Sequence, residues 1–132
     1  MILLIDNYDS FVFNVEQYIR ELTTEEVSVI RNDKITIDEI ISLNPSKIIL
    51  SPGPKHPKDS GICLDILKTL TDFPVLGICL GHQALGFVYG ATIKQLGTPV
   101  HGKTSEITIS NPSVLFKELP EKFNVMRYHS LY

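Results

Sequence analysis

The sequence predicts an α/β fold in which a mostly parallel sheet carries helices on both faces. Four short, mostly apolar runs occur at residues 2–5, 27–30, 47–51 and 74–78. Segments whose apolar residues recur at helical spacing alternate with these runs. Strands that are apolar on both faces are typical of parallel sheets buried between helices. We therefore expect the four runs to pair as parallel strands of one sheet.

The expected helices follow the strands in order along the chain. The first, at residues 11–21, comes after the polar turn "DNYDS", so Asp9 or Ser10 is expected to cap its N-terminus. The other helices are expected at residues 36–43, 61–70 and 80–89.

The C-terminal part of the sequence has a different pattern. Three strand-like segments, at residues 90–96, 105–109 and 123–128, follow one another without long helices between them. This pattern predicts an antiparallel extension of the fold. Because no repeat, low-complexity tract or linker divides the sequence, we expect a single domain over residues 1–132.

Composition and charge exclude several classes of function. The chain has 132 residues, of which 43% are hydrophobic and 20% charged, with a net charge of −3 and no basic run. These values favour a folded domain that does not bind nucleic acid. The start "MILLID" lacks a positively charged leader, and the longest apolar stretch is too short to span a bilayer. Two cysteines make no disulfide framework, so we expect a cytoplasmic protein without membrane contacts.

The stretch "GICLG", residues 77–81, places a cysteine between two glycines where a strand is expected to become a helix. In a nucleophile elbow, this turn exposes the nucleophile, and the glycines let neighbouring backbone approach closely. The helix N-terminus would lower the pKa of Cys79, and the Leu80 N–H would face a developing oxyanion. Inert packing is the alternative for Cys79, since free cysteines often fill cores. Cys63, on an apolar helix face, is expected to be a core residue.

A second candidate element is the loop "SPGPKHP" after the third strand. Ligands of parallel α/β sheets bind at the carboxyl ends of the strands, so this loop and the cysteine turn should share one edge. Pro52 and Pro54 stiffen the chain around Gly53, whose N–H is a candidate second oxyanion donor. An ordinary Pro-Gly turn is the alternative.

Five motifs, in their order along the chain, resemble those of class I glutamine amidotransferases: "LIDNYDSF", "LSPGP", "GICLGHQ", "PVHGK" and "RYHSL". The motif "DNYDSF" points to the branch that contains the small subunits of anthranilate synthase and aminodeoxychorismate synthase. The resemblance implies a flavodoxin-like sheet and the hydrolysis of glutamine to glutamate and ammonia through a Cys-His-Glu triad, without a cofactor or metal. It also implies a partner, a large synthase subunit that uses chorismate.

The resemblance assigns roles to residues of these motifs. Cys79 corresponds to the nucleophile, and the backbone N–H groups of Leu80 and Gly53 to the oxyanion donors. Residues that correspond to glutamine-binding positions are Pro52, Gly53, Pro54, Gln83, Ser130 and Leu131. A loop near the partner subunit corresponds to His101, Gly102 and Lys103.

The sequence departs from the family at the proton carrier. The family supplies the triad histidine and glutamate from a His-Pro-Glu motif, which these 132 residues do not contain, and the chain ends at Tyr132 before that part of the family's domain. The one His-Pro pair, at His56, is followed by Lys58 and lies in the wrong loop. The other histidines are His82, His101 and His129. We expect that none of the four replaces the missing base and that this chain alone lacks glutaminase turnover.

Two functions fit these observations. The chain is either a glutaminase subunit or a catalytically degenerate module of the same fold that docks on the synthase, and a downstream His-x-Glu pair in the gene would distinguish them. A receiver domain is excluded because Ser51 and Pro52 stand where the third strand would need an aspartate. A dinucleotide-binding domain is excluded because no G-x-G-x-x-G follows a strand.

Overall fold

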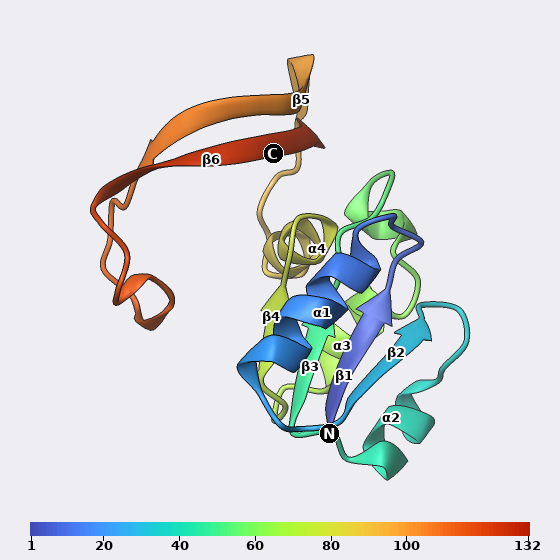
Figure 1. The fold of residues 1–132 in the computed structure, drawn as a ribbon. Coiled ribbons are helices and arrows are strands. Elements are labelled where there is room, and N and C mark those ends of the chain that lie inside the picture. Colours follow the sequence, from blue (N-terminus) through green and yellow to red (C-terminus); the bar gives the residue numbers. More distant parts are fainter. The chain divides into compact units, whose positions relative to one another are not determined.

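The computed structural model describes residues 1–132, which form two compact units, Met1–Ile93 and Lys94–Tyr132. The first unit contains a four-stranded parallel sheet in the order β2-β1-β3-β4 (Figure 1). Its strands are β1 (Ile2–Asp6), β2 (Val27–Arg31), β3 (Lys47–Leu50) and β4 (Val75–Gly77). The prediction of four parallel strands is confirmed. The single-domain prediction stays a prediction.

Four α-helices alternate with the strands of the first unit. They are α1 (Val12–Leu22), α2 (Ile37–Leu43), α3 (Cys63–Thr69) and α4 (Leu80–Val88), and a short 3₁₀ helix, η1 (Pro57–Asp59), precedes α3. Helix α2 begins with a capping box between Thr36 and Glu39. The predicted cap of α1 is wrong: Phe11 occupies the N-cap position without a side-chain cap. Asp9 instead accepts a hydrogen bond from the N–H of Phe11 at 2.7 Å, within the preceding turn.

Alternate residues of β1 point to opposite faces of the sheet and enter two separate cores. Leu3 and Ile5 pack in a core with buried residues of α2, α3 and α4. Ile2 and Leu4 pack in the other core against Val12 of α1. Figure 1 shows α1 and α3 on opposite sides of the sheet. Helices therefore cover both faces, as the apolar strands predict.

The sheet order places a topological switch between β1 and β3. The chain passes from β1 to β2 on one side, and β3 then pairs with the other side of β1. In open parallel sheets, ligands bind at the carboxyl ends of the strands beside such a switch. The segments that begin at Asn7 and Ser51 leave the sheet at this point.

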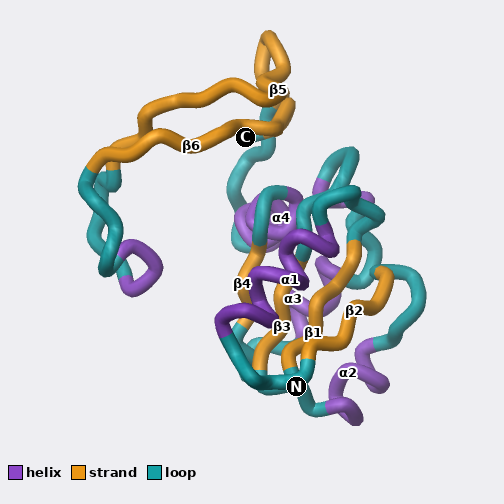
Figure 2. The backbone as a smooth tube through the Cα atoms, in the orientation of Figure 1, coloured by secondary structure: helices purple, strands orange, loops and turns teal.

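The second unit is an antiparallel ribbon of β5 (Gln95–Thr108) and β6 (Lys122–Leu131), drawn in orange in Figure 2. A short 3₁₀ helix, η2 (Val114–Phe116), lies in the connection between the two strands. The antiparallel extension is confirmed, but the strand expected at 90–96 is largely wrong because β5 begins only at Gln95. Across both units, none of the helices is long and apolar enough to cross a membrane.

One carboxylate joins the amino ends of β1 and β3. Glu25 accepts hydrogen bonds from the N-terminal ammonium group at 3.4 Å and from Nζ of Lys47 at 2.9 Å, and it also bonds the hydroxyl of Ser46. The hydrogen bond from Ser46, followed by that from Lys47, lowers the pKa of Glu25 to about 2. The folded chain therefore favours the ionised form of this carboxylate.

This lowered pKa predicts a dependence of stability on pH. Because the folded pKa of Glu25 lies below its unfolded value, its contribution is complete above the unfolded pKa of about 4.3 and is lost as pH falls toward about 2. Glu25→Gln should therefore flatten the fall in the free energy of unfolding between about pH 5 and pH 2. Urea unfolding at several pH values measures it, with exposed Glu21→Gln as the control. Parallel curves for the wild type and E25Q would contradict this role.

Candidate active site

Cys79 occupies the turn between β4 and α4. Its backbone has φ 53° and ψ −105°, and α4 begins at the next residue, Leu80. A positive φ is uncommon for a residue with a side chain and persists only where surrounding structure holds it. Cys79 is exposed, whereas Leu80 is buried. The turn predicted from "GICLG" is therefore present, and it places Cys79 at the surface of the first unit.

The two flanking glycines are required by close packing of backbone on backbone. A Cβ at Gly77 would lie 2.5 Å from the carbonyl carbon and oxygen of Gly81. A Cβ at Gly81 would overlap the backbone of Leu50, the last residue of β3. The N–H of Ile78 also donates to the carbonyl of Leu50 at 3.0 Å. The glycines thus hold the elbow directly against the end of β3.

The "PGP" loop lies against the first residue of α4. A Cβ at Gly53 would lie 2.6 Å from Cδ2 of Leu80 and 2.6 Å from Cβ of Asn7. Gly53 is therefore enclosed between the elbow helix and the segment after β1, where no larger residue fits. The structure therefore packs Gly53 against the side chain of Leu80, the other residue proposed as an oxyanion donor.

The expected lowering of the Cys79 pKa is wrong. Desolvation of the thiol raises this pKa, and the negative charge of Asp9 raises it further. The backbone N–H of Leu80 favours the thiolate but does not offset these two effects. Burial raises the pKa of Cys63 to about 11, which agrees with its fully buried position. The prediction that Cys63 is a core residue is confirmed.

The other predicted site residues fall into two groups. In the first unit, Gln83 lies one turn along α4 from Cys79, and its N–H donates to the carbonyl of Cys79 at 2.9 Å. In the second unit, the segments proposed for the partner and for glutamine are neighbours in the ribbon, since His101 pairs with Tyr128 and Val100 with His129. The predicted site residues in these two segments are His101, Gly102, Lys103, Ser130 and Leu131.

The loop expected at residues 101–103 is wrong, because these residues belong to β5. The pairing with β6 is irregular between His101 and Lys103, and Gly102 has φ 68°. A glycine in this conformation allows a bulge, which displaces the strand locally without ending it. The sequence signal "PVHGK" marks this bulge.

Three histidine rings form hydrogen bonds or ring contacts with other residues of the fold. Nδ1 of His56 accepts from the N–H of Lys58 at 3.1 Å. Arg127 donates through Nε to Nε2 of His129 at 3.0 Å, so Nδ1 carries the proton that is donated to the carbonyl of Leu131 at 2.8 Å. The ring of His101 packs edge-on against a tyrosine at 4.9 Å. These contacts support the expectation that the rings serve structure.

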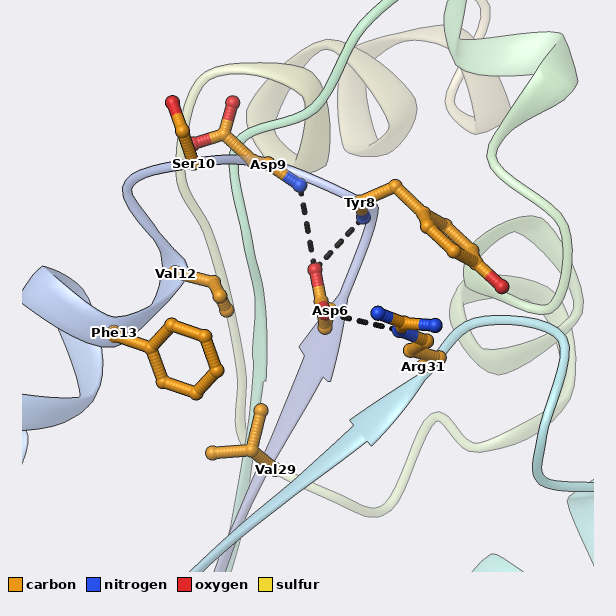
Figure 3. Close-up of a pocket in the computed structure, with 8 residues that line it drawn as sticks. All are labelled: Asp6, Tyr8, Asp9, Ser10, Val12, Phe13, Val29 and Arg31. Carbon is orange, nitrogen blue, oxygen red and sulfur yellow. Dashed lines mark hydrogen bonds and ion pairs between the residues drawn. The ribbon is translucent and has the colours of Figure 1, made fainter.

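Sequence analysis missed a pocket at the carboxyl ends of β1 and β2, which both polar and apolar side chains line (Figure 3). Asp6 accepts hydrogen bonds from the N–H groups of Tyr8 at 2.7 Å and Asp9 at 3.3 Å. Its second oxygen lies 3.8 Å from Nε of Arg31, whose guanidinium stacks on the Tyr8 ring at 4.7 Å. An aspartate that bonds the backbone two and three residues later is a turn signal readable in "DNYD".

The charge of Asp9 makes a testable contribution to the thiol. Asp9→Asn removes a negative charge that raises the pKa of Cys79, so the midpoint of its alkylation rate against pH should move to lower pH. Iodoacetamide labelling followed by peptide mass spectrometry measures the rate, and buried Cys63 is an internal control that should react at least about 100-fold more slowly. Asp33→Asn, which alters a carboxylate bonded to Tyr8, should leave the midpoint unchanged. An unmoved or raised midpoint in D9N would contradict the assignment.

Comparison with known proteins identifies the family. The family model for class I glutamine amidotransferases matches residues 3–132. The chain is 52% identical to anthranilate synthase component 2 of Pyropia yezoensis, over 99% of this chain and 69% of the relative. It is 50% identical to aminodeoxychorismate synthase component 2 of Klebsiella aerogenes, over 99% of this chain and 70% of that protein.

Among solved structures, a glutamine amidotransferase from Thermotoga maritima has the same fold, with a TM-score of 0.73 at 19% identity. That match covers 99% of this chain and 60% of the solved chain. The curated relatives share about half of their aligned residues with this chain, in addition to the fold. The chain belongs to the class I glutamine amidotransferases.

Proposed function

We propose that this chain hydrolyses the side-chain amide of glutamine and delivers ammonia to a synthase subunit that uses chorismate. The observation that carries the proposal is the exposed Cys79 on its strained turn, with Gly53 packed against the side chain of the next residue, Leu80. The two curated relatives are components of anthranilate synthase and aminodeoxychorismate synthase, which supports a partner of this kind. A free thiol nucleophile also favours the reducing cytoplasm as its compartment.

The proposed reaction begins with attack of the Cys79 thiolate on the amide carbon of glutamine. The carbonyl π electrons move to oxygen, where the N–H groups of Leu80 and Gly53 stabilise the negative charge. The amide nitrogen of the tetrahedral intermediate then takes a proton from a general acid and leaves as ammonia, while the C=O bond re-forms and a thioester remains on Cys79. Water cleaves the thioester, which yields glutamate and restores the thiol.

The proposed reaction needs a general acid, and these 132 residues provide no triad histidine to supply it. The resemblance assigns it to a His-Pro-Glu motif, which this sequence does not contain. The raised pKa of Cys79 agrees with a mechanism that uses a triad histidine, because the thiol then needs a base to form the thiolate. Members of such a triad act as a unit, and loss of one costs several powers of ten in rate. The inactivity of the 132 residues alone stays a prediction.

Replacement of the nucleophile should separate glutamine use from ammonia use. In the complex with the synthase, Cys79→Ala should lower glutamine-dependent synthesis by at least about 10³-fold, because the covalent intermediate cannot form. Synthesis supported by added ammonium salt should remain unchanged, since ammonia bypasses the glutaminase step. Product formation from each nitrogen source measures the effect, and co-purification shows that the complex still assembles. Loss of both activities in an intact complex would contradict the proposal.

The proposed partner contact at residues 101–103 is tested by charge reversal. Lys103 is exposed on β5, so Lys103→Glu should weaken binding of the synthase subunit by about 10-fold or more through its altered surface charge. Calorimetric titration measures the affinity. Lys117→Glu, an equal charge change at another exposed position of the second unit, is the matched control. Equal affinities for wild type and K103E would remove this segment from the proposed interface.

A further inference from the structure

We infer that Asn7 is a positioning residue for glutamine hydrolysis: it fixes the Ser51–Gly53 segment so that the Gly53 N–H stands beside that of Leu80. The inference rests on the proposed function and goes beyond it, because Asn7 touches neither the thiol nor any of the reacting atoms in the scheme above. It acts through the loop that carries one oxyanion donor. The chain segment after β1 thereby becomes part of the catalytic apparatus.

Two hydrogen bonds join Asn7 to the residue that begins the loop. The backbone N–H of Asn7 donates to Oγ of Ser51 at 2.9 Å, and Nδ2 of Asn7 donates to the Ser51 carbonyl at 2.9 Å. Asn7 is 3% exposed and Ser51 is completely buried, so water does not compete for these bonds. The Ser51 hydroxyl itself donates a hydrogen bond to the carbonyl of Pro52 at 2.6 Å. Asn7 therefore sets both the backbone and the side chain of Ser51.

Asn7 also supports Gly53 by direct packing. A Cβ at Gly53 would lie 2.6 Å from Cβ of Asn7 and 2.9 Å from its carbonyl oxygen. On its other side Gly53 lies against the side chain of Leu80. A shift of Asn7 would therefore move Gly53 relative to Leu80. Oxyanion donors act only when they are preorganised within a few tenths of an ångström of the developing charge.

The orientation of the Asn7 amide is fixed from its oxygen side. Oδ1 accepts from Nδ2 of Asn32 at 2.9 Å and from Sγ of Cys63 at 3.2 Å. Nδ2 of Asn32 also donates to the carbonyl of Ser60 at 3.2 Å. The oxygen faces two donors and the nitrogen faces a carbonyl, so a flipped amide would oppose like groups on both sides. An aspartate at position 7 would place a second oxygen against the Ser51 carbonyl.

The same buried region offers a control that stabilises the fold without touching the loop. Ser60 is 1% exposed, and its hydroxyl donates to the carbonyl of Pro57 at 2.6 Å. Loss of this hydroxyl leaves a buried acceptor without its donor, a cost of the same kind as the loss of the Asn7 amide donor. Only the Asn7 change also releases the Ser51–Gly53 segment. A comparison of Asn7→Asp with Ser60→Ala therefore separates positioning from stability.

The experiment compares two reactions of Cys79 in the 132-residue chain. The probe 5-oxopentanoate resembles glutamine without its α-amino group and carries an aldehyde in place of the amide. Thiol addition breaks the S–H bond, forms a C–S bond and moves the carbonyl π electrons to oxygen, which takes up the proton. The product is a hemithioacetal, detected with ¹³C-labelled aldehyde by NMR. Iodoacetamide alkylates the Cys79 thiolate, which displaces iodide, and this step needs no oxyanion donor. The ratio of the two reactions isolates the contribution of the donors.

Asn7→Asp should lower the hemithioacetal association constant by roughly 10- to 100-fold. The iodoacetamide rate of the fully ionised thiolate, read from the plateau of its pH profile, should stay within about 2-fold, since this comparison removes any change in the pKa of Cys79. Ser60→Ala should leave both values close to wild type, and urea midpoints show that the variants are folded. If Asn7→Asp does not fold, Ser51→Ala decides, because it removes the hydroxyl that accepts from the Asn7 N–H and should lower the same constant alone. Equal hemithioacetal formation in wild type and the deciding variant, or an equal loss in S60A, would overturn the inference. Absence of any Cys79 adduct in the wild type would instead overturn the proposed function.

Discussion

The contact between Gly81 and the backbone of Leu50 is the constraint on which the candidate site depends. This contact fixes the start of α4 against the end of β3. Gly77, the last residue of β4, packs against the backbone of Gly81. With both elements held, the residue between them can keep a positive φ that an isolated chain would rarely adopt. The buried sheet thus holds the turn rigidly, and the turn places Cys79 at the edge of the first unit.

In the proposed reaction, the geometry favours the charge that develops on the substrate oxygen more than the charge of the free Cys79 thiolate. The thiol of Cys79 is desolvated and close enough to Asp9 to feel its carboxylate, so its pKa is raised. The same turn aims a helix N-terminus at the reacting centre, and the Gly53 backbone lies against Leu80. Stabilising the oxyanion lowers the barrier to attack without populating a reactive thiolate in the resting protein. Such a nucleophile depends on a base, which agrees with triad chemistry.

Sequence reasoning recovered the features that local pattern determines. The four strands follow from apolar runs, and the Cys79 turn follows from glycines on both sides of one residue. It failed for features that depend on contacts between residues far apart in the sequence. The Asn7 amide bonds partners 44 and 56 residues away, and no pattern near position 7 reports them. The pKa of the Cys79 thiol likewise depends on the carboxylate of Asp9, 70 positions earlier in the chain. The strand β5 continues through "PVHGK", where a loop was expected, because a bulge at Gly102 accommodates these residues within the strand.

The central claim is that the N–H groups of Gly53 and Leu80 together receive the oxyanion formed when Cys79 attacks a carbonyl. Amide proton shifts of the ¹⁵N-labelled chain, recorded as 5-oxopentanoate forms its adduct with Cys79, test this claim most directly. The account predicts that both amide protons move downfield in proportion to adduct formation, because each gains a hydrogen bond to the former carbonyl oxygen of the adduct. An adduct on Cys79 that leaves either amide unshifted would contradict it.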